Sequence, residues 1–128
     1  MDEQPDHSAS SRIRCEGWWE QSGLGRQPMV DLQLQFGSGR IQGSGADIVG
    51  PFAFSGVISP DGRVVMVKQY IGRHSVDYVG TYDGEGMMWG RWRIGPLHGP
   101  WMITIRPGTA AATAAIQEYV PTQWEDRL

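Results

Sequence analysis

Apolar and polar residues alternate with a period of two along most of the chain, a pattern typical of β-strands that bury one face. In the clearest segment, four apolar residues at alternate positions are predicted to face the core, and their polar neighbours to face water. The inward set is Val30, Leu32, Leu34 and Phe36, and Met29 falls on the outer face. The same alternation recurs at regular spacing up to about residue 106.

Clusters of glycine, proline and polar residues separate the alternating segments and predict tight turns between them. No stretch offers the helical crossover that parallel strands need, so consecutive strands are expected to pair antiparallel. Closing into a barrel removes the unpaired edges of such a sheet. The expected fold is an all-β, eight-stranded antiparallel up-and-down β-barrel, with residues 95–100 as a loop and strands at 12–21, 28–36, 40–45, 52–58, 64–71, 75–82, 87–94 and 101–106.

The two ends of the chain differ from the barrel domain, which is expected to span residues 12–107. Residues 1–11 are polar and poor in apolar side chains, which predicts a disordered arm. Residues 108–128 combine a run of alanines with a capping residue, Thr109, and a proline stop, Pro121. This combination predicts one short C-terminal helix and a tail that pack on the barrel.

Composition and charge exclude several classes of function. The 128 residues suffice for one domain with its own core, and the net charge of −3 with interspersed signs offers no basic face for nucleic acid. Cys15 is the single cysteine, so neither an internal disulfide nor a multi-cysteine metal site is possible, and we expect it to be an inert core thiol. We expect no metal, no organic cofactor and no membrane span, and a cytoplasmic location.

The first strand carries a short motif, Gly17-Trp18-Trp19, that resembles the Gly-x-Trp opening of the lipocalins and avidins. The resemblance implies a calycin-like barrel in which the last residue of the motif, Trp19, plugs the closed end. The biotin-binding residues of the avidins have no counterparts here, so biotin binding is not implied. Residues 43–56 and 62–82 also look like a small eight-stranded barrel module from proteins of unclear function, which implies a fold and no activity.

Polar residues are densest in the central hairpin, and their placement depends on its register. If Gly72-Arg73 forms a two-residue loop, Lys68 lies opposite Asp77 and makes an exposed ion pair. A three-residue loop reverses the faces, because a slip of one residue moves every side chain to the other side of the sheet. The residues that then share one face, as a polar patch in an aromatic interior, are Lys68, Tyr70, His74 and Tyr78.

Two further positions are candidates for a ligand site. Asp47 follows a glycine-rich corner, where its carboxylate either faces the pocket rim or accepts backbone N–H groups in a turn. Trp92 is predicted to face inward, with Trp19 and Trp101 as core residues. The candidate ligand-binding set is Asp47, Lys68, Tyr70, His74, Tyr78 and Trp92.

The favoured function is that of a non-catalytic calycin-like barrel that binds a small, partly apolar ligand or acts as an interaction module. One alternative is a cofactor-free lyase, isomerase or cyclase that uses the lysine, tyrosine and histidine residues as acid and base. Another is a solid structural barrel that forms homo-oligomers through the outward-facing Trp18 and Trp89. The identity of a ligand and the register of the central hairpin stay open at the level of sequence.

Overall fold

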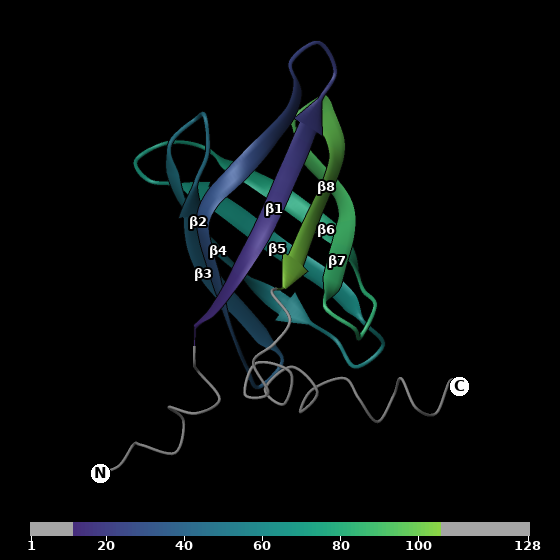
Figure 1. Ribbon diagram of the computed structural model, residues 1–128. Helices are drawn as coiled ribbons and strands as arrows, with labels where there is room; N and C mark the ends of the chain where they lie inside the picture. The colour runs from purple at the N-terminus through teal and green to yellow at the C-terminus, as the bar shows by residue number, and fades with distance from the viewer. Residues whose placement is uncertain (1–11, 106–128) are drawn as a thin grey trace.

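The chain forms a closed barrel of eight antiparallel strands that pair in sequence order, with β8 returning to pair with β1 (Figure 1). The computed structural model describes residues 12–105, so the disordered arm and the C-terminal helix predicted from the sequence lie outside the described residues. This topology confirms the predicted β-barrel. The strands are β1 (Ile13–Gln21), β2 (Gly25–Gly37), β3 (Arg40–Ala46), β4 (Pro51–Ile58), β5 (Arg63–Tyr70), β6 (Ser75–Tyr82), β7 (Met87–Ile94) and β8 (Leu97–Ile105).

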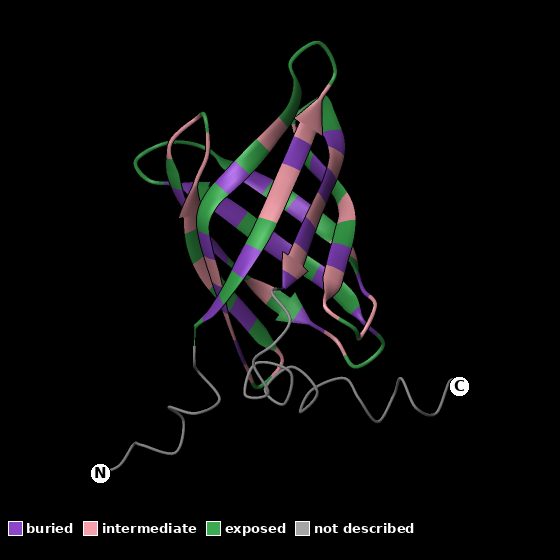
Figure 2. Cartoon of the chain, in the orientation of Figure 1, coloured by how far each residue is buried: buried purple, intermediate pink, exposed green. Residues whose placement is uncertain are grey.

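The core is the inside of the barrel, as the alternation predicts. Buried and exposed positions alternate along the strands, most regularly on β5 and β6 (Figure 2). The inward tryptophans Trp19, Trp92 and Trp101 are all buried, whereas Trp89 is 41% exposed on the outer face. Cys15 is buried as well, and burial raises the pKa of its thiol to about 12. Within residues 12–105, no helix is long and apolar enough to cross a membrane.

Glycines inside the strands allow aromatic rings and neighbouring backbones to approach closely. Gly80 on β6 lies opposite Gly90 on β7. A methyl group at position 80 would lie 2.8 Å from the ring of Trp101 and 2.1 Å from the carbonyl oxygen of Trp89. The space beside Gly80 is therefore filled, and this glycine serves close packing in a tightly curved barrel.

Strand β2 contains a bulge, and the inner face predicted for the first half of this strand is wrong. Asp31 has a positive φ of 53°, and the pairing of β2 with both neighbours shifts register around it. One extra residue reverses the alternation on one side of the bulge. Met29 is therefore buried at 5% exposure and Val30 is 48% exposed, the opposite of the prediction. From Leu32 onward the predicted faces are correct.

The prediction of a loop at residues 95–100 is also wrong, because β8 begins at Leu97. Gly95 and Pro96 alone make the turn, with Gly95 at a φ of 56°, and Ile94 pairs directly with Leu97. Pro100, which has no N–H to donate to a ladder, nevertheless lies within β8 opposite Arg91. The two prolines made this stretch resemble a loop in sequence, although only the first belongs to the turn.

The turns gather at two ends of the barrel. One end, called here the upper end, carries the turns at residues 22–24, 47–50, 71–74 and 95–96. The opposite end carries the other turns, together with the start of β1 and the end of β8 (Figure 1). The candidate ligand-binding residues lie at or near the upper end.

Candidate functional site: a buried lysine–aspartate pair beneath a pocket

The central hairpin adopts the three-residue register. Lys68 lies opposite Val76, Met66 lies opposite Tyr78, and the amide of Tyr70 donates a hydrogen bond to the carbonyl of His74 at 3.1 Å. The lysine and both tyrosines therefore point into the barrel. The alternative two-residue loop, with its exposed ion pair between Lys68 and Asp77, is wrong.

Lys68 is the only lysine in the sequence, and it is fully buried. Its Nζ atom lies 2.5 Å from Oδ2 of Asp47 and donates a second hydrogen bond, 3.2 Å long, to the hydroxyl of Tyr78. The ring centroid of Phe52 lies 4.3 Å from the same Nζ atom, within range of a cation–π contact. The ammonium thus has an anion, a hydroxyl and an aromatic face around it, as a buried cation requires.

Asp47 reaches this position from the connection between β3 and β4. Its backbone exchanges two hydrogen bonds with Gly50, and its Oδ1 atom accepts the amide of Val49 at 2.9 Å. The other oxygen, Oδ2, accepts three side-chain donors, and the carboxylate is fully enclosed. These donors are Trp19 Nε1 at 3.1 Å, Tyr70 Oη at 2.7 Å and Lys68 Nζ. The predicted backbone turn is present, and it aims the second carboxylate oxygen into the barrel.

Burial and charge act in opposite directions on this pair. Burial disfavours the ionised carboxylate of Asp47, but the hydrogen bonds from Lys68 and Tyr70 and the charge of Lys68 outweigh it and lower the pKa. Burial lowers the pKa of Lys68 to about 8, although Asp47 opposes the shift. Burial is the main cause that raises the pKa values of Tyr70 and Tyr78 well above the usual value for tyrosine. The hydrogen bond to Asp47 and its charge add to the shift of Tyr70, and the charge of Asp47 adds to that of Tyr78. At neutral pH the site therefore holds an ion pair and two protonated tyrosines.

A pocket of about 150 Å³ lies at the upper end of the barrel, beside this network. The rings of Trp19 and Trp92 meet edge to face in its wall, with centroids 5.9 Å apart. Larger hollows, among them one of about 340 Å³ over β2, β3 and β4, are lined mainly by outward-facing residues. The upper pocket is lined by Trp19, Gln21, Val49, Tyr70, His74, Val76, Tyr78, Trp92, Ile94 and Leu97.

The structure gathers the sequence-predicted ligand set in one region. Tyr70, Tyr78 and Trp92 are pocket walls, and His74 lies exposed at the rim with its ring centroid 5.1 Å from that of Tyr70. The other two members, Asp47 and Lys68, do not line the pocket. They lie behind its tyrosines and are joined to them by hydrogen bonds.

Sequence reasoning missed part of the pocket lining. Val76 and Ile94 lie two residues from Tyr78 and Trp92 on the same inner faces, so the alternation contained the signal for them. Leu97 was missed because it was assigned to a loop. The strongest unused signal was the count of lysines, since a single lysine at an inward strand position is unlike the solvated lysines of most surfaces.

No protein-family model, curated protein or solved structure matches this chain. Among residues 12–105, no three histidine, cysteine, aspartate or glutamate side chains come together as a metal site. Function is therefore inferred from the geometry of the upper pocket and of the network behind it.

Proposed function

We propose that the barrel is a non-catalytic binding protein for a small, partly apolar molecule, which it holds in the upper pocket. The observation that carries this proposal is the combination of an apolar space with a buried network whose charges are already compensated. Trp19 and Tyr70 belong to both parts, because each lines the pocket and donates a hydrogen bond to Asp47. The network holds these walls in place before a ligand arrives, which lowers the entropy lost on binding.

The size of the pocket limits the ligand. Apolar cavities of about 150 Å³ in other proteins take up benzene, and the pocket has the same volume. Its walls combine two indole rings with the aliphatic side chains of Val76, Ile94 and Leu97. A ligand of roughly one ring, or a short branched chain, fits this space.

The closed eight-stranded barrel and the motif Gly17-Trp18-Trp19 support assignment to the calycin-like barrels. One feature differs from that resemblance. In the lipocalins and avidins the motif tryptophan plugs the closed end, whereas Trp19 here lines the pocket.

The protonation states favour binding over acid–base catalysis. The enzyme alternative assigns acid and base roles to Lys68, Tyr70, His74 and Tyr78. A general base needs a free lone pair, but Lys68 is paired with Asp47, and the raised pKa values keep both tyrosines protonated. The imidazole of His74 is exposed at the rim, and no side chain in residues 12–105 is hydrogen-bonded to it to orient it as a base.

Methyl NMR with benzene as the probe tests the proposal. We expect benzene to shift the methyl signals of Val76, Ile94 and Leu97 and to leave the outer Val79 unchanged. Val76→Phe fills the pocket and is expected to abolish these shifts. The matched control is Val79→Phe, which places the same ring outside the barrel on the same strand. Shifts that persist in Val76→Phe would show that benzene binds elsewhere and would contradict the proposal.

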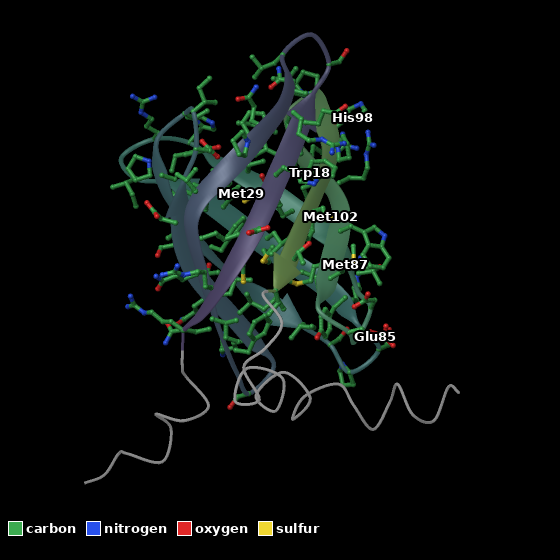
Figure 3. All side chains as sticks on the ribbon, viewed as in Figure 1. Trp18, Met29, Glu85, Met87, His98 and Met102 are labelled. Atoms are coloured by element: carbon green, nitrogen blue, oxygen red, sulfur yellow. The ribbon has the colours of Figure 1, made fainter. Side chains whose placement is uncertain are left out.

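A specific observation favours a second candidate function, self-association through the outer wall. Trp18 lies opposite Met102, and Met102 lies opposite Trp89, so the three side chains form one row across β1, β8 and β7. Figure 3 shows Trp18 and Met102 side by side on the outside of the barrel. A two-fold axis through Met102 would place Trp18 of one copy against Trp89 of the other, the geometry of an isologous dimer.

Sedimentation velocity tests this second candidate. Trp89→Glu is expected to convert a dimer into a monomer, because it buries an unpaired charge in the contact. Val57→Glu, which alters an exposed residue on β4, is the control and leaves the dimer intact. A wild-type protein that remains monomeric at all concentrations would contradict self-association.

A further inference from the structure

Tyr78 carries a hydroxyl proton that the described residues do not accept. Its oxygen receives a hydrogen bond from Lys68, its side chain lines the pocket, and the residue is only 2% exposed. Within residues 12–105, no acceptor lies within hydrogen-bonding distance and geometry of this hydroxyl. A buried donor without a partner is costly and is normally satisfied by a water molecule or a ligand.

The other buried side-chain donors of the pocket wall are already engaged. Tyr70 and the indole of Trp19 donate to Asp47, and the indole of Trp92 donates to the carbonyl of Glu20 at 3.0 Å. The three aromatic walls therefore offer a ligand their rings, whereas the hydroxyl of Tyr78 still has its proton to donate. The ammonium of Lys68 polarises the hydroxyl that it contacts and makes it a stronger donor.

The charge balance of the network selects against ionised ligands. Asp47 and Lys68 neutralise each other behind the pocket wall, so no net charge remains to compensate a buried carboxylate or ammonium. The remaining walls are mainly apolar, with Gln21 and His74 at the rim. A charged group in the pocket would lose its hydration without gaining a counter-ion.

We propose that the pocket selects a neutral molecule of about one aromatic ring that carries a hydrogen-bond-accepting oxygen, such as an aryl ketone, and that Tyr78 donates its hydroxyl proton to that oxygen. The ring lies among Trp19, Trp92 and the aliphatic side chains. This assignment rests on the proposed binding function and adds to it the chemical class of the ligand.

A pair of probes with similar shape isolates the hydrogen bond. Acetophenone carries the acceptor oxygen, and ethylbenzene lacks it. Dissociation constants for both are measured by methyl NMR on the wild type and on Tyr78→Phe. We expect the ratio of the acetophenone constant to the ethylbenzene constant to rise about five- to a hundredfold in Tyr78→Phe, because the carbonyl is then buried without a donor. Because the same ratio is compared between the wild type and Tyr78→Phe, the difference in hydrophobicity between the two probes cancels.

Tyr82→Phe is the matched control, since Tyr82 is an equally buried tyrosine on the inner face of the same strand and does not line the pocket. It is expected to leave the ratio unchanged. In the wild type, acetophenone is expected to shift the ¹³Cζ signal of Tyr78 more than ethylbenzene does, a readout that needs no substitution. Benzoate is expected not to bind at concentrations that saturate the protein with acetophenone.

The outcomes separate this inference from the function on which it rests. If both probes bind in the pocket and the ratio is the same in Tyr78→Phe and the wild type, the inference is overturned and the binding function stands. Benzoate binding as tight as that of acetophenone also overturns it. If neither probe binds the wild type, the inference and the proposed function fail together.

Discussion

At the scale of single residues, the pairing of Lys68 with Asp47 determines the character of the site. A lysine side chain inside a small barrel displaces apolar volume and loses its hydration, so it destabilises the fold unless its charge is neutralised. Here one carboxylate, itself held by the amide of Val49, provides that neutralisation. The two side chains are separated by 21 positions in sequence and meet because Asp47 lies in the β3–β4 connection and β4 pairs with β5, which carries Lys68.

Removing one member of this pair is expected to be more harmful than removing both charges. Lys68→Met leaves the carboxylate buried without its cation and should lower the free energy of unfolding by about 3–5 kcal/mol. Adding Asp47→Asn keeps an acceptor oxygen for Trp19 and Tyr70 but removes the charge. Urea denaturation of the two single variants and the double variant should give a coupling of more than about 1 kcal/mol. Additive effects would show that the pair is not coupled.

The pKa of Lys68 can be measured directly, because lysine-selective labelling yields a single side-chain signal. NMR titration is expected to show a midpoint of about 8, below the ordinary 10.5. At pH values between about 8 and 10.5, Lys68 binds more protons in the unfolded chain than in the folded chain. The contribution of Lys68 to the free energy of unfolding therefore rises as the pH increases from about 8 to 10.5. A midpoint at or above 10.5 would contradict the buried position.

Asp47 is expected to govern stability in acid. Its pKa is lowered in the folded state, so its contribution to stability is complete above the unfolded value of 3.8 and is lost as the pH falls through the folded value. In denaturation at a series of pH values, Asp47→Asn should show less loss of stability below pH 3.8 than the wild type. Parallel pH profiles for the two proteins would contradict this role.

At the scale of strands, the bulge at Asp31 marks a place where the alternation of apolar and polar residues fails to predict the inner face. Outside the central hairpin, whose register the sequence left open, the apolar pattern correctly predicted the inner faces of the strands except the first half of β2, where one additional residue reverses it. A bulge has little signature in a single sequence, because Asp and other polar residues at such a position also fit a regular outer face. The sequence therefore predicts the strand and leaves its local register undetermined.

Alanine substitutions distinguish the observed face from the predicted one. Met29→Ala should lower the free energy of unfolding by about 2–5 kcal/mol, as for a buried methionine. Val30→Ala should change it by less than about 1 kcal/mol, because this side chain is half exposed. Thermal or urea denaturation measures both. A larger loss of stability in Val30→Ala than in Met29→Ala would contradict the bulge and show that Val30 faces the core.

The glycine contact between β6 and β7 makes a second prediction at this scale. Gly80→Ala places a methyl group against the Trp101 ring and the opposing backbone and should lower stability by at least about 1–3 kcal/mol. Ser75→Ala, at an exposed site on the same strand, is the control and should change stability by less than about 0.5 kcal/mol. Equal effects in urea denaturation would show that the strands do not approach so closely.

The hairpin between β5 and β6 explains why the site was only partly predictable. Both loop lengths fit the sequence between Tyr70 and Ser75, and the choice decides whether Lys68 faces water or the core. The structure has the three-residue loop, which sets Lys68 opposite Val76 and inside the barrel. The sequence singled out both Lys68 and Asp47 as candidates, but it did not pair them, because Asp47 reaches Lys68 from the β3–β4 connection beyond the end of the neighbouring strand β4.

At the scale of the whole molecule, the two ends of the barrel have different roles. The start of β1 and the end of β8 lie at one end (Figure 1). The pocket, its tryptophan walls and the aspartate turn lie at the other. A ligand can therefore reach the upper end without displacing the start of β1 or the end of β8. The outer row of Trp18, Met102 and Trp89 lies on the side wall, so the proposed ligand site and the proposed contact between copies use separate surfaces.

The most direct test of this account is a crystal structure determined under xenon pressure, because xenon occupies accessible apolar cavities. We predict a xenon atom in the upper pocket beside Trp19 and Trp92, with Nζ of Lys68 hydrogen-bonded to Asp47 behind Tyr78. Side chains that fill the pocket and leave no xenon site, or a Lys68 that turns out to solvent, would contradict it.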